Sequence, residues 1–400
     1  MNPWTKLPPD AHPALALGRR LAGAGVAAID TPALVIDLDA MERNLTRMAE
    51  FAQKHKVRWR AHAKLHKSAA LARLQMRAGA VGVCVQNTAE AELLAAGGVH
   101  NLYISNEVIA TPKLERVAAL AQTLHEVQGR LALAVDSAEG VQRLAAAMAS
   151  RPQAGASIDV FVEIDVGQGR CGVAPGAPAV ALAQEIDQHP ALVFAGLQAY
   201  HGGAQHLRTV RERREAIARA VAAVTLTRQQ IEATGIPVAL VTGAGTGTFA
   251  LEAASGVYGE LQPGSFLFMD ADYAQNERDP AQPQFEHALF VKTEVISTSA
   301  NHVVCDAGHK SHAIDSGMPR VHTLPGGAAL TYANGGDEHG ILRAAAPGGA
   351  LPALGETLWL IPGHCDPTVN LHDGLIGVRG GLAQGTVERV IAVDARGALS

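Results

Sequence analysis

The chain has few cysteines, few aromatic residues and no excess of basic charge. Its four cysteines lie far apart and form no CxxC pair, so neither a disulfide framework nor a thiolate zinc site is indicated. A formal net charge of −5 disfavours nucleic acid or an anionic membrane as a partner, because both attract basic surfaces. No apolar run approaches the roughly 18 residues of a membrane span, and the first residues lack the layout of a signal peptide. These absences predict a cytoplasmic protein that acts on a small molecule.

Short apolar or β-branched runs alternate with Ala/Leu-rich helical segments between about residues 33 and 270. Eight runs fit a (β/α)8 barrel, although an open doubly wound sheet would show the same local signals. Beyond about residue 285, short strand-like runs are separated by Gly/Pro turns. The sequence therefore predicts an α/β fold, with a barrel over 30–285 and a smaller antiparallel β domain over 286–400 that residues 1–29 join. The eight runs are 33–39, 57–63, 81–86, 101–106, 131–137, 159–165, 194–200 and 238–243.

Polar residues at the ends of predicted strands are the first candidates for a site, because function in such barrels collects where the strands end. Lys64 follows the second run, where a buried amine with a lowered pKa could form an imine with an aldehyde cofactor. Lys67 competes for this role, and an ordinary solvated lysine is the simpler interpretation of either. The full set is Lys64, Gln86, Asn106, Asp136, Arg170, Tyr200, His201 and the loop 242–248.

Two glycine-containing turns follow the late runs of the predicted barrel. TGAGTGTF (242–249) offers backbone N–H groups and threonine hydroxyls, which suit a phosphate, and QPGSF (262–266) is a second turn of small residues. Neither matches the dinucleotide-binding GxGxxG pattern. The glycines are equally explained by tight turns without a ligand.

The segment GHCDPT (363–368) places His364 and Asp366 two residues apart. In an extended segment both side chains would project to one side and could bind one metal ion. Imidazole and carboxylate suit Mn²⁺, Mg²⁺, Co²⁺ or Zn²⁺ and leave coordination positions for water and substrate. A surface turn stiffened by the following proline is the alternative, and DAGHKSH (306–312) is a rival set of ligands.

Taken in order, these motifs resemble the fold type III pyridoxal-phosphate enzymes with an alanine-racemase-like barrel. The resemblance is closer to the group that includes D-threonine aldolase, 3-hydroxy-D-aspartate aldolase and D-serine dehydratase. It covers nearly the whole chain, through TPALVIDLDAMERN (31–44), RAHAKLHK (60–67), VEIDVGQGRCGV (162–173), LQAYHG (197–202), GAGTGT (243–248), DAGHKSHAIDSG (306–317) and PGHCDPTVNLHD (362–373).

The resemblance implies a role for each matched residue. Lys64 would carry pyridoxal phosphate as a Schiff base, and His364 and Asp366 would bind a divalent metal, with Mn²⁺ expected first. His309, His201 and a metal-bound water are the candidates for the base that takes the hydroxyl proton. The remaining cofactor contacts would be Gln86, Arg170 and Tyr200 at the ring, Gly245, Thr246, Gly264 and Ser265 at the phosphate, and Tyr273.

The second metal position separates the branches of this group. Aldolase-like members pair histidine with aspartate, whereas the dehydratases typically place cysteine there. Asp366 therefore implies retro-aldol cleavage of a D-β-hydroxy-α-amino acid to glycine and an aldehyde. A metal-dependent D-serine or 3-hydroxyaspartate dehydratase is the alternative. A racemase is disfavoured because it needs a tyrosine base and none is evident near 306–312, and a non-enzymatic cofactor carrier would need no metal pair. The family also implies a homodimer.

Overall fold

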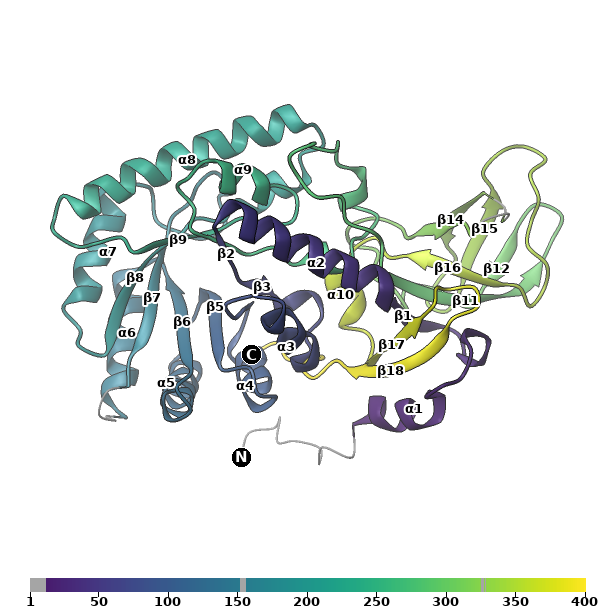
Figure 1. Cartoon of the computed structure of the whole chain (residues 1–400), viewed down its shortest axis with the longest axis horizontal. Coiled ribbons are helices and arrows are strands. Elements are labelled where there is room, and N and C mark those ends of the chain that lie inside the picture. Colours follow the sequence, from purple (N-terminus) through teal and green to yellow (C-terminus); the bar gives the residue numbers. More distant parts are fainter. Residues whose placement is uncertain (1–11, 152–155, 325–326, 328) are drawn as a thin grey trace.

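The computed structural model describes residues 12–151, 156–324, 327 and 329–400. Two lobes lie side by side, with the barrel on the left of Figure 1 and a sheet of green and yellow strands on the right. Residues 1–11, which the sequence assigned to the β domain, lie outside the described residues.

The first lobe is a parallel sheet that closes on itself. β2 and β3 are two parts of one extended stretch interrupted at Arg60; β2 pairs with β10 and β3 pairs with β4. The nine segments therefore form an eight-stranded barrel, and the predicted (β/α)8 fold is confirmed. In sheet order they are β2 (Arg58–Trp59), β10 (Glu260–Leu261), β9 (Leu240–Gly243), β8 (Leu192–Gln198), β7 (Ile158–Glu163), β6 (Arg130–Val135), β5 (Asn101–Glu107), β4 (Val83–Val85) and β3 (Ala61–His62).

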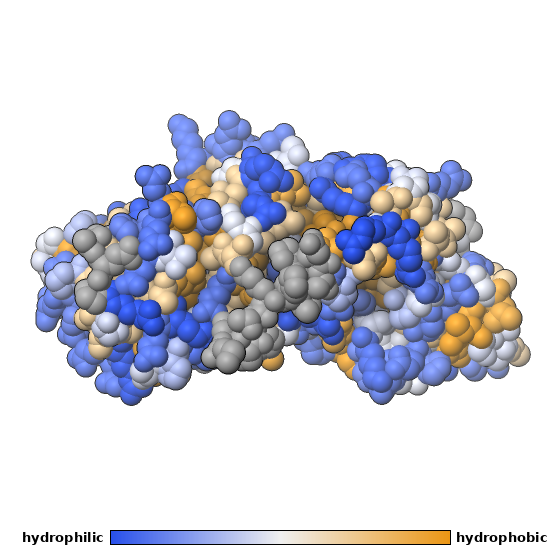
Figure 2. Space-filling model, turned by 90° about the horizontal axis from the view of Figure 1, so that it is seen from below, coloured by the Kyte–Doolittle hydropathy of each residue, from blue (hydrophilic) through white to orange (hydrophobic). Residues whose placement is uncertain are grey.

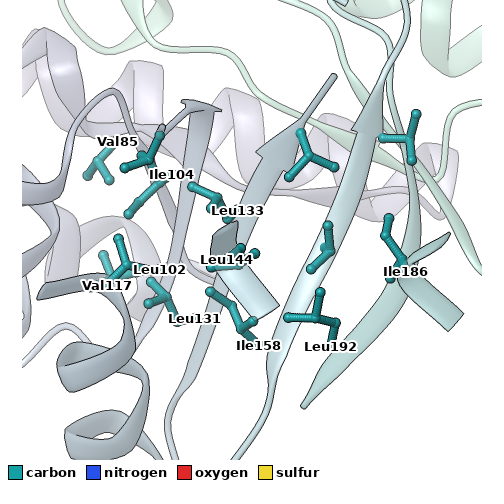
Figure 3. Packing of buried hydrophobic residues seen from close by; sticks show 14 of the residues in the cluster. Val85, Leu102, Ile104, Val117, Leu131, Leu133, Leu144, Ile158, Ile186 and Leu192 are labelled. Carbon is teal, nitrogen blue, oxygen red and sulfur yellow. The ribbon is translucent and has the colours of Figure 1, made fainter. Parts of the chain in front are cut away.

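Helices cover the outside of the barrel. Figure 3 shows apolar side chains of β5 and β6, such as Leu102 and Leu133, packed towards Val117 and Leu144 of the covering helices. Each such buried side chain contributes roughly 1.5–3 kcal/mol, and burial on both faces of the strands explains their nearly continuous apolar runs. The covering helices are α2 (Leu38–His55), α3 (Ala69–Arg77), α4 (Thr88–Ala96), α5 (Thr111–Glu126), α6 (Ala138–Ala149), α7 (Ala177–Asp187), α8 (Val210–Glu232) and α9 (Phe249–Ala254).

The second lobe is a mixed, mostly antiparallel sheet, as predicted. Its main path runs β14 (Leu330–Asn334), β15 (Gly340–Ala344), β12 (Val303–Cys305), β11 (Leu289–Thr298), β1 (Ala33–Asp37), β17 (Gly374–Arg379) and β18 (Thr386–Ala392). Strand β16 (Thr357–Ile361) pairs with β11 and with β13 (Arg320–His322). Only the pair β1 and β17 is parallel among these described strands.

The run at 33–39 forms a strand, but the prediction that it belongs to the barrel is wrong. This strand, β1, lies between β11 and β17 in the second sheet. The eighth barrel strand is instead β10, whose two residues are too short to make an apolar run. Local patterning shows that a strand is buried, but its partner depends on contacts far away in sequence.

The described part of the N-terminal segment packs on the second lobe. Helix α1 (Pro13–Leu21) contacts β18. The Gly23 N–H donates to the Val387 carbonyl at 2.9 Å, and the Val26 N–H donates to the Gly385 carbonyl at 3.0 Å.

The face seen from below in Figure 2 is mostly hydrophilic. Within the described ranges, no helix combines the length and apolarity needed to cross a bilayer.

Candidate active site

A cavity of about 390 Å³ lies where the barrel strands end, and residues that follow β16 of the second lobe contribute to its wall. Its size is that of a typical small-molecule site. The structure brings most of the predicted residues into this cavity. They are Lys64, Gln86, Arg170, Tyr200, Gly245, Thr246, Gly264, Ser265, Tyr273, His364 and Asp366.

Lys64 lies in the short 3₁₀ helix η3 (Ala63–Leu65), which begins directly after β3. Its Nζ is 3.5 Å from Asp366 Oδ2, and this carboxylate, acting against burial, raises the pKa of the lysine. The lowered pKa expected from the sequence is therefore wrong for this structure, because the carboxylate that raises the pKa belongs to the other lobe and lies far away in sequence. Lys67 is buried outside the cavity, with its Nζ 3.1 Å from Glu90 Oε1.

The two predicted phosphate turns lie next to each other at the cavity wall. Thr246 follows β9, and its Oγ1 accepts the backbone N–H of Phe266 from the turn after β10 at 3.0 Å, which links the turns. A Cβ on Gly245 would lie 2.5 Å from Gln205 Oε1, so a larger residue there would have to displace the end of that side chain. In the described part of the chain, no acceptor pairs with the backbone N–H groups of these cup residues: Gly245, Thr246, Gly264 and Ser265. Free N–H groups converging from two turns fit a phosphate.

The predicted ring contacts surround the same space. The Arg170 guanidinium carbon lies 5.8 Å from the centre of the Tyr200 ring, and one of its nitrogens lies 3.8 Å from Glu163 Oε1. Burial, together with Glu107, raises the pKa of Glu163 to about 8. Gln86 Nε2 lies 2.7 Å from the Nε2 of His62. A pyridine ring with polar substituents can pack against the planar groups and form hydrogen bonds with the polar ones.

The predicted metal pair lies where β16 ends and helix α10 (Cys365–Val369) begins. His364 caps the helix and Asp366 lies in its first turn, so the extended segment expected from the sequence is wrong, although both side chains still converge. His364 Nε2 lies 3.1 Å from Asp366 Oδ2, and Cys365 Sγ turns away towards the Met269 carbonyl. Among the described residues, Asp366 Oδ1 is buried without a hydrogen-bond partner.

The charges of this pair support each other. Burial opposes the charge of His364, but hydrogen bonds to Asp270 and Asp366 outweigh it and raise the pKa of the imidazole to about 10. Burial also opposes ionisation of Asp366, yet Lys64 and His364 hold the pKa of its carboxyl well below its usual range. A buried carboxylate oxygen without a partner beside an imidazole nitrogen fits a divalent cation, which would replace the proton on the imidazole.

Two histidines that were candidates for the base do not line the cavity. Tyr200 and His201 are adjacent at the end of an extended segment, so their side chains take different directions. Tyr200 lines the cavity, whereas His201 Nδ1 accepts the N–H of Ala204 at 3.3 Å. His309 lies in the second lobe with its Nε2 2.8 Å from Asp337 Oδ1.

Two further strand-end residues also lie outside the cavity and have structural partners. The Asn106 side-chain amide donates to the Gln86 carbonyl at 3.0 Å. Asp136 Oδ2 accepts the Gly172 N–H at 3.2 Å. Both side chains hold neighbouring loops in place.

The rival ligand segment 306–312 does not assemble a metal site. Asp306 Oδ1 accepts the hydroxyl of Thr293 at 2.6 Å. His312 Nε2 lies 2.9 Å from the hydroxyl of Tyr332, a residue of β14. The expectation that no tyrosine lies near segment 306–312 is therefore wrong for the folded chain. Tyr332 does not line the cavity. Across the described ranges, no three His, Cys, Asp or Glu side chains are placed to hold a metal ion.

The cavity also contains residues that the sequence analysis did not select. Two histidines lay within or just beyond the motifs RAHAKLHK and LQAYHG, so proximity to those motifs could have found them. The glutamines carried the same signal, since Gln168 lies in VEIDVGQGRCGV, Gln198 in LQAYHG and Gln262 in QPGSF. Ser105 lies in none of these motifs. The added residues are His62, Ser105, Gln168, Gln198, Gly202, Gly203, His206 and Gln262.

His206, at the end of the 3₁₀ helix η4 (Gly202–His206), is the added residue with the clearest chemistry. Its Nδ1 lies 2.7 Å from Asp272 Oδ2, and Arg208 also pairs with this carboxylate. Burial opposes the charge of Asp272, but hydrogen bonds from Arg208 and His206 lower the pKa of its carboxyl. An ionised Asp272 keeps the proton on Nδ1, which leaves Nε2 of His206 able to accept one.

Two family models match the chain. The alanine racemase N-terminal domain matches residues 36–272, and the putative serine dehydratase domain matches residues 288–378. Among curated proteins, the D-threonine aldolase of Arthrobacter sp is 44% identical over 98% of this chain and 97% of its own length. The 3-hydroxy-D-aspartate aldolase of Paracoccus denitrificans (strain Pd 1222) is 40% identical over 94% and 95%.

Solved structures agree with these matches. D-threonine aldolase from Filomicrobium marinum superposes with a TM-score of 0.89 at 48% identity, covering 95% of this chain and 99% of that one. A more distant relative is the D-threo-3-hydroxyaspartate dehydratase of Delftia sp. (strain HT23), 32% identical over 85% of this chain and 92% of its own length. A cysteine variant of that dehydratase has been solved in a metal-free form. The chain therefore belongs to the D-threonine aldolase and 3-hydroxy-D-aspartate aldolase family of fold type III pyridoxal-phosphate enzymes.

Proposed function

We propose that the protein is an aldolase, dependent on pyridoxal phosphate and a divalent metal, that cleaves D-threonine and similar D-β-hydroxy-α-amino acids into glycine and an aldehyde. The observation that carries this proposal is that Lys64, His364 and Asp366 line the same cavity. Lys64 Nζ lies 3.5 Å from Asp366 Oδ2, and His364 Nε2 lies 3.1 Å from the same oxygen. A group suited to the amino end of a substrate thus lies next to groups suited to its hydroxyl.

The chain would hold both cofactors with the residues already described. When bound, pyridoxal phosphate supplies a conjugated ring that accepts the electrons of the cleaved Cα–Cβ bond, and the metal supplies a Lewis acid for the β-hydroxyl. Lys64 would hold the cofactor aldehyde and the turns after β9 and β10 its phosphate. Arg170 and Tyr200 would flank the ring. His364 and Asp366 would hold the metal.

We assign the role of hydroxyl base to His206, in place of His201 and His309. It lines the cavity, and Asp272 on its Nδ1 leaves Nε2 free to take a proton. After cleavage the same Nε2 can give this proton to the α-carbon of the product glycine. The hydrogen bond from Arg208 keeps Asp272 ionised, so the ring is held in one orientation throughout.

Replacing His206 with glutamine is expected to lower kcat for D-threonine cleavage by roughly 10²–10⁴-fold, the usual contribution of a general base. Mn²⁺ affinity and the cofactor absorbance should stay near their wild-type values. His309→Gln serves as the comparison, because that histidine lies outside the cavity. A large loss in His309→Gln with a small one in His206→Gln would reverse the assignment.

A dehydratase is the second candidate, favoured by the match of residues 288–378 to the putative serine dehydratase domain. Incubating the holoenzyme with D-threonine separates the two. We expect glycine and acetaldehyde in equal amounts, lost with a chelator and restored by Mn²⁺. Formation of 2-oxobutyrate and ammonia would instead establish the dehydratase, and full cleavage in excess chelator would remove the metal from the proposal.

We also propose a preference for neutral β-substituents over a β-carboxylate. Among the residues that line the cavity, the lysine and arginine side chains are Lys64 and Arg170, both assigned to the cofactor. Arg320 instead lies 3.1 Å from His287, outside the cavity. D-threonine and D-phenylserine should therefore outrank 3-hydroxy-D-aspartate in kcat/KM when the same product assay is run on all three.

Three further proposals complete this picture. Mn²⁺ is the proposed metal, because one imidazole and one carboxylate with open positions suit it. A homodimer is proposed from the family, and light scattering on the purified protein measures it. A cytoplasmic location is proposed because all four cysteines are free thiols, three of them buried.

A further inference from the structure

Asp270 is a fully buried carboxylate in the segment that joins the barrel to the second lobe. The backbone around it is tied to the approach to helix α10. The Ala271 N–H donates to the Pro362 carbonyl at 2.9 Å, and the Asp272 N–H donates to the Gly363 carbonyl at 3.1 Å. Asp270 thus lies where the end of the barrel meets the two residues that precede His364.

Each oxygen of Asp270 has a defined partner. Oδ1 accepts the backbone N–H of Tyr273 at 2.9 Å. Oδ2 accepts the backbone N–H of Cys365 at 3.3 Å and lies 2.8 Å from His364 Nδ1. Two backbone donors from different lobes therefore fix the carboxylate before any contact with the imidazole is considered, so it cannot simply turn to follow the ring.

We propose that Asp270 is a positioning residue for the metal: it holds the proton on Nδ1 of His364 and directs Nε2 towards the point that Asp366 also faces. This inference rests on the metal dependence proposed above. His364 Nε2 lies 3.1 Å from Asp366 Oδ2 while Nδ1 lies 2.8 Å from Asp270, so the two carboxylates occupy opposite ends of one ring. A metal bound at Nε2 displaces nothing from Nδ1. A carboxylate on the far nitrogen also makes the imidazole a stronger donor to a metal.

The same carboxylate connects the metal side of the cavity to its cofactor side. Through Oδ1 it fixes the start of the 3₁₀ helix η6 (Tyr273–Gln275), and Tyr273 lines the cavity near the phosphate turns. Asp270 therefore sets the separation between the metal ligand from the second lobe and a residue that follows the barrel. If Asp270 only made this structural connection, replacing it would leave the affinity for the metal unchanged.

The test is a Mn²⁺ titration of the holoenzyme, followed by the electron paramagnetic resonance signal of free Mn²⁺. Asp270→Asn keeps the shape and removes the charge, and we expect roughly 10–100-fold weaker Mn²⁺ binding, the usual cost of losing such a partner. The cofactor absorbance should stay close to wild type, whereas the melting temperature in chelator should fall, because asparagine has one acceptor oxygen for the two backbone N–H groups that Asp270 accepts. Asp272→Asn is the matched control, because this nearby buried carboxylate contacts His206 instead of His364. It should retain wild-type Mn²⁺ affinity.

Equal Mn²⁺ affinity in Asp270→Asn and wild type, or equal losses in Asp270→Asn and Asp272→Asn, would overturn the role of Asp270 and leave the proposed aldolase intact. A wild-type protein that binds no Mn²⁺ would overturn both. If Asp270→Asn does not fold, ¹⁵N resonances of wild-type His364, assigned with His364→Gln, answer the question. Adding Zn²⁺ should shift Nε2 while Nδ1 keeps its proton, and the reverse pattern would refute the proposal.

Discussion

Replacement of Lys64 by alanine is expected to abolish both the visible absorbance of the bound cofactor and cleavage of D-threonine, with activity falling by roughly 10³-fold or more. Among the residues that line the cavity, Lys64 is the lysine, and its Nζ lies 3.5 Å from Asp366 Oδ2. A noncovalently held cofactor would keep its phosphate contacts but lose the covalent attachment through which the substrate amine enters. Spectra and product assays on the purified variant measure both effects.

Lys67→Gln is the matched control for this experiment. Lys67 lies three residues away and pairs with Glu90, and glutamine can keep a hydrogen bond there. This variant should retain the cofactor band. Borohydride reduction followed by peptide mapping adds a direct readout, since the label should fall on Lys64. A band that survives in Lys64→Ala and disappears in Lys67→Gln would transfer the role to Lys67.

Replacement of Asp366 by alanine is expected to spare the cofactor and lower cleavage by roughly 10²–10⁴-fold, because the Lewis-acid contribution of a metal is worth several kcal/mol. The change removes the buried Oδ1 that has no partner among the described residues, and also the oxygen that faces His364 Nε2. Mn²⁺ binding should weaken accordingly. Activity, Mn²⁺ titration and the cofactor spectrum are measured on the same preparation.

Asp373→Asn provides the control for loss of a carboxylate in this part of the chain. Asp373 is half-exposed, pairs with Arg396 at the surface and does not line the cavity, so its substitution should leave the activity near the wild-type value. If Asp366→Ala kept full activity with metal bound, the metal pair would have to be sought elsewhere. If it lost the cofactor as well, the separate roles assigned to Lys64 and Asp366 would fail.

The sequence predicted the barrel more accurately than it predicted the strands that compose it. The run at 33–39 is apolar on both faces because it lies in the middle of the second sheet, and that pattern matches an inner barrel strand. The true eighth strand, Glu260–Leu261, is too short to show any periodicity. The predicted number of strands was right because these two errors compensate.

In the candidate site too, some residues were predicted from the sequence and others were placed only by the fold. Lys64, the phosphate turns, Arg170 and the His364–Asp366 pair were all found in sequence because each lies in a compact motif, and the structure brings them into one cavity. His201 and His309 were selected from similar motifs but point elsewhere. Asp270 and Asp272 gave no signal, since a single carboxylate becomes informative only when its partner is known.

By itself, the sequence determined the two-lobe architecture, the family and the short segments proposed to carry cofactor and metal chemistry, because burial patterns and compact motifs are local properties of a chain. The tertiary structure decided the pairings across long distances in sequence. It placed β1 in the second sheet, set Lys64 3.5 Å from Asp366, and gave His364 and His206 their carboxylate partners. These contacts join segments dozens to hundreds of residues apart, and hydrogen bonds and charge interactions act only over a few ångströms, so only the folded chain brings them into effect.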